Sequence, residues 1–104
     1  MKISDFISLP DSEVFGGPEI LTQGRVLPPP LKALYADYHG DWHKAHEYAS
    51  SEESIEAAWV HAYLHRKEGD LSNARYWYRV AEKTVFKGTL EEEWKDIVLK
   101  LLSN

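Results

Sequence analysis

Apolar and polar positions follow different patterns before and after Pro30. From Pro30 onward, apolar residues recur every three or four positions, which is the spacing of one face of an α-helix. This pattern is interrupted at Gly40, Gly69 and Gly88, and glycine is typical of helix ends. The pattern predicts an all-α fold of about five helices, over residues 31–39, 41–50, 54–68, 71–84 and 89–102.

Residues 1–30 contain all five prolines of the chain and no sustained apolar period. They are nevertheless rich in apolar side chains, so we expect an extended arm that packs on the helical body. The predicted organisation is an arm over 1–30 and a single α-helical domain over 31–104, with hairpins 31–51 and 53–84 and a capping helix 89–102. The apolar anchors of the arm are Ile3, Phe6, Ile7, Leu9, Val14, Phe15, Ile20, Leu21, Val26 and Leu27.

Polar residues at the expected helix starts support these boundaries. Asp41 and Asp70 each follow a glycine and are suitable N-caps. Thr89 and Glu92 have the spacing of a capping box. The helix over 54–68 is apolar on nearly all sides, which is typical of a helix buried between others, so we expect it at the centre of the fold.

The triplet Tyr76, Trp77 and Tyr78 lies in the following helix. Three adjacent residues point in widely different directions around a helix, so these aromatic rings cannot share one surface. We expect the helix over 89–102 to pack against those that face away from the central helix.

Two segments resemble one another: HGDWHKAHEYA (39–49) and EGDLSNARYWY (68–78) share Gly-Asp, a following apolar residue and an alanine. A helix is predicted on each side of both Gly-Asp pairs, which is typical of stacked helical hairpins. The pattern resembles the tetratricopeptide repeat family, in a degenerate form, and implies a surface that binds peptides or other helices. The matching positions are Gly40, Asp41, Trp42 and Ala45 in the first copy, and Ala62, Gly69, Asp70, Leu71, Ala74, Tyr78 and Ala81 in the second.

The segment WVHAYLHRKEGDLSNARYWYRVA (59–81), with the H-x-x-H-E motif from His43 to Glu47, carries a closer resemblance. It is similar to a group of small bacterial and fungal proteins with the core W-x-H-A-x-L-H-R-x-E-G-D-x-x-N-A-x-Y-W-Y. This resemblance implies a shared helical fold, and it implies no activity.

Histidines offer the clearest candidate chemistry. His61 and His65 are four residues apart, so both imidazoles of one helix face can bind a single metal ion. His43 and Glu47 repeat this spacing on the preceding helix. If the two faces meet, these four residues form a metal or His-based catalytic site. The alternative is that the histidines make polar contacts where helices cross.

A second candidate is a binding surface for an anion. Arg66 and Arg75, together with His46, His61 and His65, would form a positive area suited to a carboxylate or phosphate. The alternative is that Arg66 pairs with a nearby carboxylate, Glu68 or Asp70, and that Arg75 is solvated.

Charge and composition exclude several classes. A net charge of −5 argues against nucleic-acid binding, and the absence of cysteine excludes disulfides and thiolate chemistry. The apolar runs are too short to span a bilayer, and we expect a cytoplasmic monomer or homodimer without a cofactor. We therefore predict a non-catalytic module that binds a protein, a peptide or a small anionic ligand. The alternative is a small metalloprotein or enzyme that uses the His43/Glu47 and His61/His65 pairs.

Overall fold

The computed structural model describes residues 1–16 and 27–103, which form seven helices and no strand. The all-α prediction is therefore confirmed for these residues. None of the helices described is both long and apolar enough to cross a membrane. The helices are α1 (Ile3–Ile7), α2 (Asp11–Phe15), α4 (Pro29–Tyr38), α5 (Trp42–Ser50), α6 (Ile55–Glu68), α7 (Leu71–Val80) and α8 (Leu90–Leu102).

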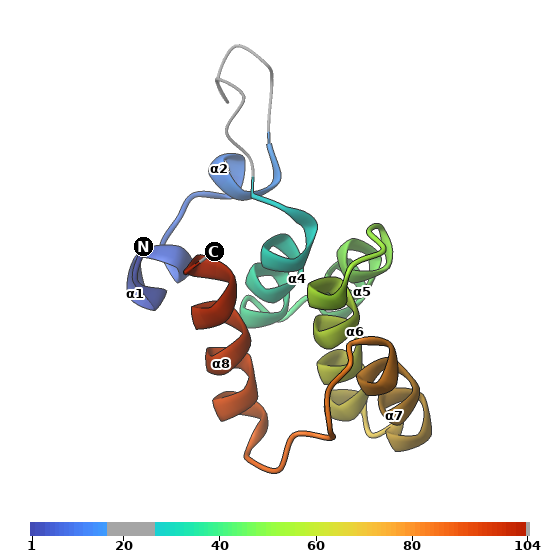
Figure 1. Cartoon of the computed structure of the whole chain (residues 1–104). Helices are drawn as coiled ribbons and strands as arrows, with labels where there is room; N and C mark the ends of the chain where they lie inside the picture. Colours follow the sequence, from blue (N-terminus) through green and yellow to red (C-terminus); the bar gives the residue numbers. More distant parts are fainter. Residues whose placement is uncertain (17–26, 104) are drawn as a thin grey trace.

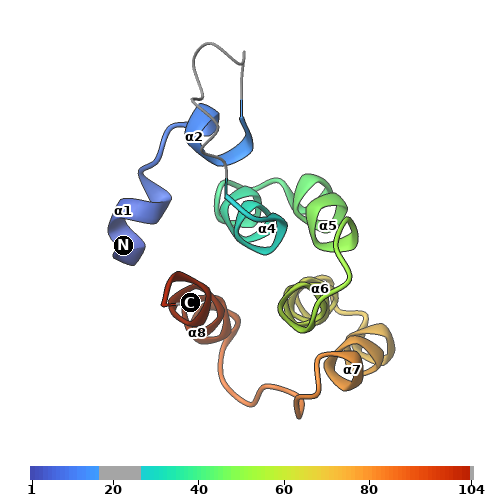
Figure 2. The same cartoon turned by 45° about the horizontal axis from the view of Figure 1, so that its top comes forward.

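Two helical hairpins stack side by side and the last helix closes the stack. α4 packs on α5, α6 packs on α7, and the two pairs meet mainly through α5 and α6. Figures 1 and 2 show that α8 returns across the molecule to lie beside α4 and α6. It thus covers the side of α6 that faces away from α7.

The turns of the two hairpins have the same geometry. Gly40 and Gly69 adopt φ of 86° and 90°, a left-handed conformation that favours glycine. In each turn the next residue, Asp41 or Asp70, donates its backbone N–H to the carbonyl oxygen five residues earlier. Its carboxylate then accepts a backbone N–H of the following helix, as predicted for an N-cap. One Gly-Asp pair therefore ends one helix and begins the next.

α6 is the centre of the fold, as its sequence predicts. Every residue from Ala57 to His65 is buried, because α4, α5, α7 and α8 all pack around this helix. Ser54 caps its first turn by accepting the N–H of Ala57. Burial on all sides means that each polar side chain in this run needs a partner from a neighbouring helix.

α7 is shorter than its sequence predicts and ends at Val80 rather than at residue 84. Glu82 adopts a left-handed φ of 59°, and Lys83 donates its N–H to the carbonyl oxygen of Tyr78, which closes the helix. The left-handed residue that follows a helix is usually a glycine, but after α7 it is Glu82.

α8 begins at the predicted capping box: Thr89 accepts the N–H of Glu92, whose side chain accepts the N–H of Thr89. Its apolar stripe, with Trp94, Ile97 and Val98 buried, faces the hairpins. The indole N–H of Trp94 donates to the carbonyl oxygen of Leu34 over 3.0 Å, which fixes α8 on α4.

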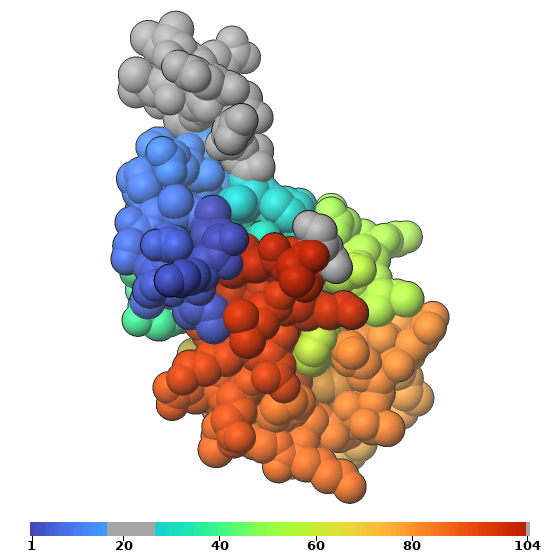
Figure 3. Space-filling view, turned by 60° about the vertical axis from the view of Figure 1, so that its left-hand side comes forward, coloured from blue at the N-terminus to red at the C-terminus, as the bar shows by residue number. Residues whose placement is uncertain are grey.

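The first sixteen residues differ from the expected extended arm because they contain α1 and α2. Each helix is about one turn long and buries one apolar side chain fully, Phe6 or Val14. The hydroxyl of Tyr35 lies 2.7 Å from the carbonyl oxygen of Leu9, so this part of the chain is also held by a polar contact. Figure 3 shows its first residues, in dark blue, against α8. The anchors Ile20, Leu21 and Val26 lie outside the described residues.

The contact between α6 and α7 predicts the effect of a larger side chain at Ala74. This alanine is 2% exposed, so Ala74→Leu should overpack the hairpin and lower the free energy of unfolding by about 1–3 kcal/mol. Arg75→Ala on the exposed side of α7 is the matched control and should change it by less than about 0.5 kcal/mol. Urea denaturation measures both, and equal stability of the two variants would contradict the hairpin contact.

Candidate functional site

Three of the five histidines converge between α5 and α6. His61 and His65 lie one turn apart on α6, and His46 faces them from α5. The Nε2 atoms of His46 and His61 are 3.0 Å apart. One ring nitrogen of each histidine lies within 4.8 Å of those of the other two. We call His46, His61 and His65 the histidine cluster.

Two tryptophans hold the rings of this cluster in place. Trp42 stacks on His46, with ring centroids 5.0 Å apart and an interplanar angle of 14°. Trp77 of α7 stacks on His61 at 3.8 Å and 11°. The indole N–H of Trp42 also donates to the carbonyl oxygen of Leu64 over 2.9 Å. The orientations of His46 and His61 are therefore fixed by stacking as well as by their mutual contact.

His65 is oriented by a carboxylate. Its Nδ1 lies 2.6 Å from Oε2 of Glu68, the next residue but two along α6. An ionised carboxylate only accepts hydrogen bonds, so we assign the proton of His65 to Nδ1. That assignment leaves Nε2 with its lone pair free to act as an acceptor or a metal ligand.

Burial keeps two of the three imidazoles, those of His46 and His61, uncharged at neutral pH. His61 and His65 are each 6% exposed, whereas His46 is partly exposed. Burial, reinforced by His46 and His65, lowers the pKa of His61 from 6.5 to about 4. The pKa of His46 is also lowered, chiefly by burial and then by His65. Neutral imidazole is the form that binds metal ions, so His46 and His61 are ready to bind without losing a proton to solvent first.

The other half of the predicted metal site lies elsewhere. His43 and Glu47 are exposed on α5, and His46 takes their place beside His61 and His65. The reason is the orientation of α5, which turns Ala45 and Ala49 toward the core and thereby brings His46 to α6. A spacing of four residues therefore identified the two histidines of α6 that lie together with His46, but the pair on α5 does not face them.

The two arginines of the predicted anion site do not join the histidine cluster. Arg66 donates to Oε1 of Glu93 over 2.9 Å and also to the carbonyl oxygen of Gly88, on the side of α6 that faces α8. Its expected partners are engaged elsewhere: Glu68 with His65, and Asp70 at the start of α7. Arg75 is exposed on α7.

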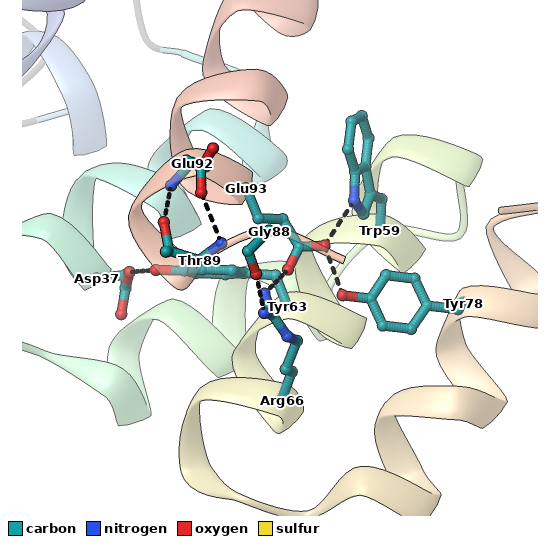
Figure 4. Close-up of polar contacts among 9 residues, drawn as sticks. All are labelled: Asp37, Trp59, Tyr63, Arg66, Tyr78, Gly88, Thr89, Glu92 and Glu93. Carbon is teal, nitrogen blue, oxygen red and sulfur yellow. Dashed lines mark hydrogen bonds and ion pairs between the residues drawn. The ribbon is translucent and has the colours of Figure 1, made fainter. Parts of the chain in front are cut away.

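Glu93 is the centre of a second polar cluster, drawn in Figure 4. This carboxylate is completely buried and accepts from Trp59 Nε1 over 3.0 Å, from the hydroxyl of Tyr78 over 2.5 Å and from Arg66. Burial, followed by the hydrogen bond to Glu93, raises the pKa of Tyr78, so its hydroxyl remains a donor. Because protein donors occupy both carboxylate oxygens and no solvent reaches them, this cluster has a structural role.

Sequence analysis missed Glu93 because the run Glu91-Glu92-Glu93 is also what a helix dipole favours in a first turn. A signal was present, since Glu93 lies three residues after Leu90 and four before Ile97, within the apolar stripe of α8. Asp37, near the end of α4, was also missed: it is buried and accepts from Tyr63 over 2.6 Å and from Lys67 over 2.8 Å.

Comparisons of this chain with models of protein families, with curated proteins and with solved structures find no match. The tetratricopeptide resemblance and the resemblance to small bacterial and fungal proteins therefore stay predictions. The function has to be inferred from the chemistry of the site itself.

The lowered pKa of His61 predicts how the stability of the metal-free protein depends on pH. Between its ordinary value of 6.5 and about 4, the unfolded chain binds a proton at this residue that the folded chain does not. The free energy of unfolding should therefore fall as the pH is lowered through this range.

Urea denaturation with a chelator present measures this effect. His61→Gln should have a shallower dependence on pH than the unmodified protein. His43→Gln, at an exposed position on α5, is the matched control and should keep the original slope. Identical slopes for the two variants would show that His61 is not held in its neutral form.

The ion pair between Arg66 and Glu93 predicts a large loss of stability when its cation is removed. Arg66→Met leaves a completely buried carboxylate without its charged partner and should cost about 3–5 kcal/mol. Lys95→Met, which breaks the exposed pair with Glu91, should cost about 0–1 kcal/mol. Thermal or urea denaturation compares the two, and a cost for Arg66→Met as small as for the control would contradict a structural role.

Proposed function

We propose that this protein binds a divalent first-row transition metal ion, zinc in first place, through His46, His61 and His65. One observation carries the proposal: three imidazoles from two helices bring a nitrogen each within 4.8 Å of one another. Contacts that merely join two helices need one pair of partners, whereas a metal ion needs several ligands directed at one point.

The distances between the nitrogens suit a tetrahedral ion. Zinc–nitrogen bonds of about 2.0–2.1 Å place two ligand nitrogens about 3.3 Å apart. The nitrogens of His46 and His61 are already 3.0 Å apart, so little movement is needed there. Imidazole suits zinc, copper, nickel and iron, and the chain contains no cysteine that would favour a thiolate site.

Glu68 supports the proposal as a positioning residue. Metal-binding histidines usually donate their second ring N–H to a carboxylate, which fixes the tautomer and increases the basicity of the ligand nitrogen. The contact of 2.6 Å between His65 and Glu68 has this form. Three histidine ligands also leave a fourth position for water or another molecule, which is typical of catalytic zinc sites.

The proposal favours the metalloprotein alternative from the sequence over a site for an anionic ligand. Arg66 is engaged with Glu93 and Gly88, so the positive charge expected beside the histidines is directed toward α8. His46 and His61 are neutral at neutral pH because their pKa values are lowered. Two neutral imidazoles attract an anion weakly, but they offer lone pairs to a cation.

Zinc titration of the chelator-treated protein tests the proposal. Isothermal titration calorimetry should show one zinc ion per chain, and cobalt should give the visible absorption of a tetrahedral site. His46→Ala and the double variant His61→Ala, His65→Ala should lose stoichiometric binding, since each removes ligands. Glu68→Gln should weaken zinc binding by about 10–100-fold while retaining the site.

His43→Ala is the matched control, because it removes a histidine from the exposed side of α5. It should bind zinc as tightly as the unmodified protein. Circular dichroism confirms that each variant is folded before its affinity is compared. Absence of stoichiometric zinc, or equal losses for His43→Ala and His46→Ala, would show that the proposal is wrong.

A further inference from the structure

A groove of about 640 Å³ lies beside the histidine cluster, between the connection from α5 to α6 and one side of α7. His61 contributes to both the groove and the cluster, but His46 and His65 do not line the groove. Its volume is in the range of pockets that hold small molecules. We refer to it as the α5–α7 groove.

The walls of the α5–α7 groove expose large apolar side chains. Ile55, Tyr76 and Val80 are 45%, 51% and 42% exposed, and all three line it. Tyr76 and Val80 are exposed because α8 packs on α4 and α6 and leaves this side of α7 uncovered. The expectation that the last helix packs on the aromatic rings facing away from the central helix is therefore wrong: Tyr76 is exposed at the groove, and Trp77 stacks on His61 of α6.

The charged side chains of the groove are all acidic. Glu52 and Glu53 line it, and no lysine or arginine does among the residues described. Oε2 of Glu52 accepts the hydroxyl of Ser54 over 2.7 Å, a contact that holds this carboxylate beside the groove.

Aromatic rings add a second feature that favours a cation. Tyr76 and Trp77 meet edge to face, with centroids 5.1 Å apart and an interplanar angle of 89°. The faces of such rings attract organic cations, and this attraction increases where water is partly excluded. Carboxylates and aromatic rings at one apolar groove match a ligand that is positively charged at one end and apolar along its length.

We propose that the α5–α7 groove binds a small organic ammonium ion with an apolar body, such as a protonated alkylamine or arylalkylamine. The ammonium group binds Glu52 and Glu53, and the apolar body lies on Ile55, Tyr76 and Val80. This site goes beyond the proposed metal site, because none of these five residues is a metal ligand.

Two probes of similar shape and opposite charge test the inference: 2-phenylethylammonium and 3-phenylpropionate. In two-dimensional NMR titrations of the chelator-treated protein, the ammonium should cause saturable shifts that map to the groove, and the carboxylate should not. The double variant Glu52→Gln, Glu53→Gln should weaken ammonium binding about tenfold or more, because it removes the charge and keeps the shape. Val80→Ser should also weaken it, through loss of apolar contact.

Matched controls lie on α8, away from the groove. Glu91→Gln removes an exposed carboxylate and Leu99→Ser an exposed apolar side chain, and both should leave ammonium binding unchanged. Equal binding of the two probes, shifts outside the groove, or no saturable shift would overturn the inference. Because zinc is absent from these titrations, failure here leaves the metal proposal intact, and failure of zinc binding leaves this one intact.

Discussion

The buried carboxylate of Glu93 joins parts of the molecule that no local contact brings together. It accepts hydrogen bonds from Trp59 and Arg66 on α6 and from Tyr78 on α7, while it belongs to α8. Removing a carboxylate from water is costly, and only a complete set of donors offsets that cost. The position of α8 is consequently specific: a shift of one residue along its axis would separate Glu93 from all three donors.

The burial of α6 explains why the molecule has two polar clusters with different properties. Polar side chains on one side of this helix, Arg66 above all, meet α8, where both oxygens of the Glu93 carboxylate accept hydrogen bonds from the protein. Those on the other side, His61 and His65, face α5: His46 of α5 is the partner of His61, and the partner of His65 is the exposed Glu68 of α6 itself. Each neutral ring has one donor and one acceptor, and the donor of His65 is engaged with Glu68 rather than with another histidine. An unused lone pair therefore remains on Nε2 of His65 in the histidine cluster, whereas each oxygen of Glu93 already has a donor.

The sequence allowed the local parts of this architecture to be predicted well. Gly40, Gly69 and the aspartates after them determine the hairpin turns through contacts within a few residues, and the capping box of α8 is equally local. His61 and His65 were found because one helix fixes their spacing. His46 was assigned to the binding surface but not to the metal site, since its distance from α6 depends on how α5 is rotated. The partners of Arg66 and Asp37 come from distant helices, and the preference of Glu for helix starts concealed the burial of Glu93.

The attachment of α8 has a consequence for the order in which the fold is completed. Both hairpins are made of contacts between neighbours in sequence, which form quickly, whereas Trp94 reaches back to Leu34 across 60 residues. On the ribosome, α8 is synthesised after both hairpins. Until it arrives, the ring of Trp59 and the guanidinium of Arg66 lack their carboxylate, and one apolar side of α4 and α6 is uncovered. The nascent chain therefore passes through a stage in which this apolar surface is exposed and can aggregate with other molecules. Packing of α8 on α4 and α6 then covers the surface.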